Sequence, residues 1–171
     1  MDAYGCSKPN TTNDDLASWW RSMKIGLKRL PTRKGPLAIG INQGGLFTRV
    51  MPQSVSPDIQ FHFATLSADM AGAKPHPFPG FTMSVCQLRP TSRGHVRLAS
   101  RDPMAAPSMQ PYYLSTDEDR ACAVASLRFA RRLAATTSLS PYVVEEIRPG
   151  AAVQGDDDLL AFARAFGATI F

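Results

Sequence analysis

The chain has 171 residues, 44% of them hydrophobic, which is enough to bury the core of one domain but too few for a dinucleotide-binding domain together with a substrate domain. Its formal net charge of +5 permits an anionic partner, but the basic residues are scattered, the densest groups being 28–34 and 128–132, so we expect no nucleic-acid partner. The sequence also lacks the run of about eighteen apolar residues that a membrane-spanning helix needs.

The N-terminal third predicts a short strand over residues 3–6 and then one helix. This helix starts near Asn13, with Thr12 or Asn13 as its cap, and ends at Pro31. Its apolar face consists of residues at helical spacing, namely Leu16, Trp19, Trp20, Met23 and Leu27. The glycine-rich segment 34–45 has no GxGxxG pattern, so no phosphate-binding loop is predicted there.

The middle of the chain predicts strands. Residues 58–66 alternate apolar positions with Gln60, His62 and Ala64, as a half-buried strand does. Three prolines at every second position make 70–80 an extended loop. Segments 82–88 and 95–100 then predict a β-hairpin with its turn at Gly94.

Two helices follow. Ser115 and Glu118 form a capping box for a helix that runs to about Ala135, and a last helix begins near Asp156. The apolar positions predicted to face inward in the last helix are Leu159, Leu160, Phe162, Ala163 and Phe166. The fold class is therefore α+β, with a mainly antiparallel sheet and helices packed on one side. Segments 58–66, 82–88 and 95–100 should pair in one sheet, with the 115–135 helix across it.

The three cysteines, Cys6, Cys86 and Cys122, are far apart and show no CxxC spacing. This pattern favours free buried thiols in a reducing, cytoplasmic setting over a disulfide framework or a metal site. No signal peptide pattern opens the sequence.

The string QLRPxSRGHVRLxSRDP, which starts at Gln87 and is followed by YLS at residues 113–115, resembles the C-terminal region of the glucose-methanol-choline (GMC) oxidoreductases. Residues 57–63, 140–150 and 155–171 fall in the same family's order and spacing. The likeness is greatest to the bacterial choline dehydrogenase and alcohol dehydrogenase branch. It implies that residues 1–171 are a single partial GMC substrate-binding domain.

The resemblance implies oxidation of a primary alcohol to an aldehyde, with hydride transfer to FAD. The family binds FAD through an N-terminal domain with a GxGxxG loop, which this sequence lacks. Its catalytic histidine is expected immediately after Phe171. We therefore expect the isolated chain neither to bind FAD nor to catalyse. The expected partners are a small-molecule alcohol and the flavin domain of the same protein, and membrane association stays open. The alternative is a non-catalytic binding module or remnant derived from such a domain.

His62 is the candidate substrate-binding residue. By periodicity alone, a histidine on the less apolar face of a strand is either a hydrogen-bonded structural residue or a ligand. The resemblance implies the second role, because the matching histidine of choline oxidases lines the substrate pocket. His76 and His95 are expected to be surface residues.

The remaining chemical candidates have structural interpretations. Helix capping and solvation account for Glu145, Glu146 and Asp156, and one member each of the Trp19/Trp20 and Tyr112/Tyr113 pairs is expected in the core. Choline-specific relatives carry a glutamate in the strand that resembles residues 4–6. Here that stretch is Tyr-Gly-Cys, with no carboxylate, which argues against choline and leaves a neutral aliphatic or aromatic alcohol open.

Overall fold

The computed structural model describes residues 2–9, 11–35, 40, 42–69 and 73–168. A five-stranded sheet in the order β2-β3-β4-β1-β7 forms its centre, and every neighbouring pair in that sheet is antiparallel. The strands are β1 (Asp2–Cys6), β2 (Asn42–Thr48), β3 (Ile59–Ala64), β4 (Gly80–Gln87) and β7 (Val143–Arg148). The predicted α+β class and the pairing of 58–66 with 82–88 are confirmed.

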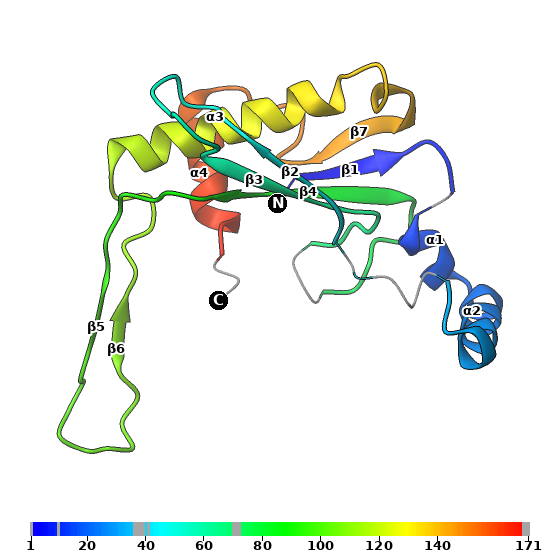
Figure 1. Ribbon diagram of the computed structural model, residues 1–171, viewed down its shortest axis with the longest axis horizontal. Helices are drawn as coiled ribbons and strands as arrows, with labels where there is room; N and C mark the ends of the chain where they lie inside the picture. The colour runs from blue at the N-terminus through cyan, green and yellow to red at the C-terminus, as the bar shows by residue number, and fades with distance from the viewer. Residues whose placement is uncertain (1, 10, 36–39, 41, 70–72, 169–171) are drawn as a thin grey trace.

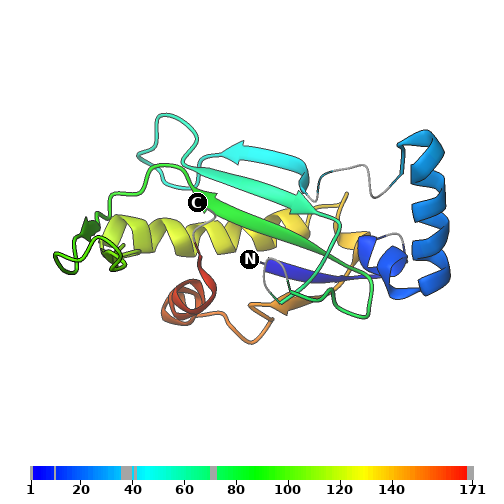
Figure 2. The same ribbon diagram turned by 90° about the horizontal axis from the view of Figure 1, so that it is seen from below.

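One face of the sheet packs against helix α3 (Asp117–Ala134), which lies across the strands (Figures 1 and 2). The apolar positions of β3 and β4 alternate as predicted, and they meet small residues of α3. This main core comprises Tyr4, Ile59, Phe61, Phe81, Met83, Cys122, Ala130 and Ala134. Burial of these side chains fixes which face of each strand points away from α3.

Helix α4 (Asp156–Phe166) begins where predicted and stands beside the β7 edge of the sheet (Figure 2). Leu159 and Phe162 pack against Leu127 of α3 in a second, smaller core. Phe166 was expected to face inward, but it is half exposed. Its ring instead lies under the guanidinium group of Arg148, 4.8 Å away, at the end of β7.

The predicted hairpin does not form. β4 ends at Gln87, and the chain leaves the sheet as an arm in which β5 (His95–Arg97) pairs with β6 (Ser108–Gln110) (Figure 1). The backbone N–H groups of Thr91 and Ser92 donate to the buried carboxylate of Asp119 in α3, at 2.9 and 2.8 Å, rather than to a neighbouring strand. Asp119 thus fixes the base of the arm to the helix.

Two details of the arm and of α3 also differ from the prediction. Gly94 is not a turn residue: it lies against the backbone of Gln110 and Pro111, where a side chain would collide. Helix α3 is capped by Thr116 rather than by Ser115, and the Thr116 hydroxyl accepts from the Asp119 N–H. Tyr112 and Tyr113 both lie exposed on the arm, so neither belongs to the core.

The predicted N-terminal helix is broken at Ser18 into α1 (Thr12–Ala17) and α2 (Trp19–Thr32). Ser18 has extended backbone angles, which end one helix and start the next. The N-cap is Thr11, whose N–H donates to the Asp14 carboxylate. No residue of α2 is buried, and both tryptophans are exposed. The prediction that the apolar face of this helix belongs to the core is therefore wrong.

Candidate functional site

The sheet face opposite α3 is covered at one end and open at the other. Because side chains alternate along a strand, the registers of β2, β3 and β4 put six residues together on the open part. They are Gly45, Phe47, Gln60, His62, Ser84 and Cys86. None of the six is buried, and we call this surface the open face.

His62 lies in the middle of the open face. It pairs with Gly45 on one side and with Ser84 on the other, and its side chain is half-buried. The neighbouring row of Phe47, Gln60 and Cys86 lies nearer the C-terminal end of β4. Imidazole, amide and hydroxyl groups therefore stand side by side on this surface, together with the small residues Gly45 and Cys86 and the exposed ring of Phe47. Such a set can donate or accept hydrogen bonds at an oxygen of a small ligand.

The covered end of the same face lies under the loop that follows β3. Ser67 of this loop is fully buried and packs against Gly80 so closely that a β-carbon at residue 80 would collide with its hydroxyl oxygen. Asn13 fixes the loop from α1: its side-chain amide donates to the Ser67 carbonyl oxygen at 2.8 Å and to the His76 carbonyl oxygen at 2.9 Å. The loop thus sets one boundary of the open face.

His76 was expected to be a surface residue, but it belongs to this loop network. Its Nδ1 lies 3.2 Å from the Ser67 hydroxyl and its Nε2 lies 3.3 Å from the Asp69 carboxylate. This order resembles that of a catalytic triad. Ser67 is inaccessible, however, and its hydroxyl also receives the Asn13 amide, so no substrate carbonyl can approach it. We assign the network a structural role.

Arg148 joins the loop to the end of α4. Its guanidinium donates to the carbonyl and to the carboxylate of Asp69, each at 2.6 Å, and lies over Phe166. Sequence patterns give no sign of this junction, because the three residues are far apart in the chain. The C-terminal end of α4 is therefore held next to the loop that bounds the open face.

The two glutamates of β7 separate, as strand alternation requires. Glu146 points to α3 and pairs with Arg131 at 3.0 Å in a largely buried ion pair. Glu145 pairs with Gly5, and a β-carbon added at residue 5 would lie 3.4 Å from the Glu145 Cγ. Gly5 pairs with Gly80, four residues along β4 from the partner of His62, so Glu145 and His62 do not converge.

The three cysteines have different environments. Cys122 is buried in the core, and desolvation raises the pKa of its thiol to about 11. Cys6 is half-buried, whereas Cys86 is exposed on the open face, which contradicts the expectation of three buried thiols. Cys86 lies at the end of β4 where no helix covers this side of the strand. Within the described residues, no group of three or more His, Cys, Asp or Glu side chains could hold a metal ion.

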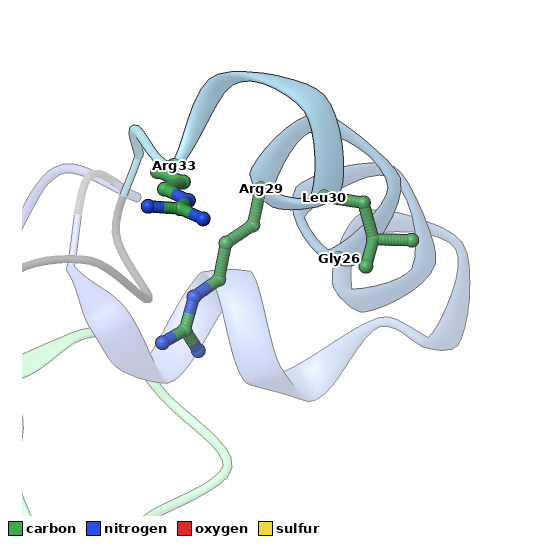
Figure 3. Close-up of a pocket in the computed structure, with 4 residues that line it drawn as sticks. All are labelled: Gly26, Arg29, Leu30 and Arg33. Atoms are coloured by element: carbon green, nitrogen blue, oxygen red, sulfur yellow. The ribbon is translucent and has the colours of Figure 1, made fainter.

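Two surface pockets lie away from the open face. One of about 550 Å³ lies at α2 (Figure 3), and one of about 570 Å³ lies between α4 and residues 149–153. The open face itself is a surface rather than a cavity. To enclose a small molecule there, a second surface must approach it.

The family model described as GMC oxidoreductase matches residues 90–171. The chain is also 34% identical to an oxygen-dependent choline dehydrogenase from Proteus mirabilis over 168 residues, which is 98% of this chain and 30% of that protein. The chain belongs to the GMC oxidoreductase family. An alcohol dehydrogenase from Pseudomonas putida is 34% identical over 139 residues, 81% of this chain and 25% of that enzyme.

One solved structure has a similar fold. The structure of a formate oxidase from Aspergillus oryzae superposes with a TM-score of 0.82 at 16% identity, over 94% of this chain and 33% of that enzyme. At this identity the match concerns the fold. The chain spans about 30% of the length of the GMC relatives that it matches. The match to the Proteus mirabilis protein covers nearly the whole chain, and so includes the sheet, α3 and the open face.

Proposed function

We propose that this GMC chain forms the substrate side of an FAD-dependent alcohol dehydrogenase, which oxidises a primary alcohol to an aldehyde. The observation that carries the proposal is His62 in the middle of the open face, between Gly45 and Ser84. In this proposal the flavin domain of the same protein supplies the second surface. The isolated chain then has half of a site and no catalysis of its own.

The open face fits one side of a flat ring system. Glycine at 45, serine at 84 and cysteine at 86 keep the surface around His62 low, and the polar groups of His62, Gln60 and Ser84 remain available at it. Bound FAD supplies the two-electron acceptor for alcohol oxidation. The role of this chain is to orient the substrate hydroxyl through His62 and to exclude water when the flavin domain covers the face.

The catalytic base in this proposal follows Phe171. The Arg148 junction supports that placement, because α4 ends beside the loop that bounds the open face. A segment leading on from α4 starts on the same side of the sheet as His62. His62 then acts as a positioning and hydrogen-bonding group, and the proton of the alcohol passes to the later histidine.

We further propose an uncharged alcohol as substrate. The residues of β1 on the open side of the sheet are Ala3 and Gly5, neither of which carries a charge. Glu145 beside Gly5 is the carboxylate on that side, but it lies away from the His62 row. Turnover of short neutral alcohols should therefore exceed turnover of choline at equal concentration.

The test uses the complete enzyme that carries this chain. His62→Ala should lower kcat/KM roughly tenfold or more, since the variant loses a group that positions the reacting atoms. Bound FAD and the midpoint of thermal unfolding should change little, because the half-buried His62 side chain is not part of the core between the sheet and α3. His95→Ala on the arm is the matched control and should keep full activity. Full activity of His62→Ala would instead support a non-catalytic or purely structural role for this face.

A further inference from the structure

Helix α2 is an exposed amphipathic helix that serves none of the roles above. Its apolar side chains are largely in solvent, with Trp19 67% exposed, Trp20 63% exposed and Leu30 79% exposed. It packs against the body of the protein through α1, where the Ser22 hydroxyl donates to the Asp15 carbonyl oxygen. Figures 1 and 2 show α2 at one end of the sheet, away from α3 and α4.

The apolar and basic residues of α2 lie on separate sides. Trp19, Met23 and Leu30 recur at spacings that put them on one stripe with Trp20 and Leu27. Lys24 and Lys28, four residues apart, lie beside that stripe. No carboxylate occurs anywhere from residue 16 to residue 57. The folded helix therefore concentrates positive charge that looked scattered in the sequence.

The C-terminal end of α2 adds two further cations. Arg29 and Arg33 line an open pocket of about 550 Å³ together with Gly26 and Leu30 (Figure 3). The Arg29 and Leu30 side chains extend in different directions from the helix. Because Leu30 lines the pocket and also belongs to the apolar stripe, the pocket borders that stripe. Two guanidinium groups at one pocket match the oxygens of a phosphate group.

We propose that α2 binds the surface of an anionic lipid bilayer, with the tryptophan stripe in the interfacial region and the basic side chains at the headgroups. A helix of 14 residues is too short to span a bilayer, and within the described part of the chain no helix is long and apolar enough to do so. An apolar stripe with tryptophans beside a lysine- and arginine-rich face is the pattern of helices that lie in the membrane plane.

Charge argues for this occupant over a second copy of the chain. A two-fold contact through α2 would bring the cations of both helices together, which is unfavourable. Nucleic acid would match the charge, but base stacking would use only the two tryptophans and would leave Met23, Leu27 and Leu30 in water. The proposal does not depend on the assigned reaction, since α2 and the open face are different surfaces.

Tryptophan fluorescence tests the proposal directly, because Trp19 and Trp20 are the only tryptophans of the chain. The 171-residue chain is mixed with vesicles of phosphatidylcholine alone or with 30 mol% phosphatidylserine, some carrying brominated acyl chains. With the anionic vesicles the emission should shift to the blue, bromine should quench it, and the protein should float with the lipid. Salt at 0.5 M should weaken the binding, because it screens the lysine and arginine contacts.

Variants distinguish the two parts of the helix. Leu30→Glu should abolish flotation, whereas Leu98→Glu, at a still more exposed site on the arm, should leave it unchanged. Lys28→Ala should weaken partitioning roughly fivefold, from about 1 kcal/mol per basic residue near an anionic surface. Arg101→Ala on the arm is the matched control for charge.

Besides failed flotation, three results would overturn the proposal. The first is an emission spectrum that anionic vesicles leave unchanged. The second is a blue shift that grows with protein concentration in the absence of lipid, which would make α2 a contact between copies. The third is shielding of both tryptophans from iodide in the complete enzyme without vesicles, which would show that another part of the enzyme covers α2. Flotation failure with normal alcohol oxidation would reject the membrane proposal and leave the proposed function intact.

Discussion

Gly80 of β4 lies directly beneath Ser67 of the loop that bounds the open face. A β-carbon at residue 80 would collide with the Ser67 hydroxyl oxygen, stand 2.8 Å from Ser67 Cβ and stand 3.0 Å from the Tyr4 carbonyl oxygen. Ser67 cannot move away easily, because Asn13 holds both its backbone and its side chain. The contact therefore ties the loop, the sheet and α1 together.

Gly80→Ala should lower the free energy of unfolding by roughly 1–3 kcal/mol, since it overpacks a buried site. The measurement is urea denaturation followed by circular dichroism. Ser67→Gly combined with Gly80→Ala should recover part of the loss, because it removes the colliding atoms. Gly26→Ala in α2 is the control: nothing lies within 4 Å of its new methyl group, so this change should stabilise the helix by about 0.5–1 kcal/mol. An unchanged unfolding midpoint for Gly80→Ala would contradict the close packing.

The ionisation of Asp119 should make the free energy of unfolding depend on pH in the acidic range. Burial opposes its ionisation, but hydrogen bonds from Ser92, Thr91 and Gln87 outweigh that effect and hold its pKa well below the usual range. The folded-state pKa is thus lower than the pKa in the unfolded chain. The stability that Asp119 contributes is complete above about pH 4 and is lost as the pH falls toward the folded pKa.

Asp119→Asn should lower the free energy of unfolding at pH 7 by roughly 1.5–3 kcal/mol, the range for hydrogen bonds to a charged group. It should also reduce the slope of stability between about pH 4 and pH 2. Asp117→Asn, two residues earlier and fully exposed, should do neither. Urea midpoints measured across this pH range give both quantities. Equal pH slopes in the wild type and in Asp119→Asn would exclude a lowered pKa at Asp119.

The thiols should react in the order of their exposure. At pH 8, Cys86 should be alkylated first and Cys122 only after unfolding, because Cys122 is buried and its pKa is raised to about 11. Mass spectrometry of peptides gives the rate at each site. In the complete enzyme Cys86 should react at least tenfold more slowly than in the isolated chain if the flavin domain covers the open face. Equal rates in the two proteins would place that domain elsewhere.

Flavin binding provides a further prediction. The 171-residue chain should purify colourless and should gain no visible absorbance after incubation with FAD and gel filtration, because in the proposed function the open face is only one side of a site. Restoring the flavin domain and the segment beyond Phe171 should bring back the yellow colour and alcohol-dependent dye reduction. Stoichiometric FAD on the isolated chain would refute this division of the site.

Periodicity predicted those elements whose burial follows from their own pattern. Residues 58–66, 82–88 and 156–166 alternate or repeat clearly, and the structure has a strand or helix at each. The 95–100 run was paired wrongly, since its partner depends on Asp119, whose burial no local pattern shows. The helix near Trp19 was predicted correctly as amphipathic but placed in the core, because a pattern identifies an apolar side without identifying what covers it. His62 was assigned to the less apolar face of its strand, and that placement is confirmed. The Arg148 junction could not be predicted, because its three residues are far apart in the sequence and meet only in the folded chain.

The position of β1 has a consequence for how the chain folds. This strand comes first in the sequence but lies between β4 and β7, so its two neighbours are synthesised about 80 and about 140 residues later. Within the described sheet, β1 can pair with β4 only after about 80 further residues have been made, and its pairing with β7 forms later still. Pairings of such long sequence separation slow folding and leave unpaired strands exposed meanwhile. Truncation before residue 143 should therefore leave β1 open to pairing with other chains, even though every residue of β1 is present.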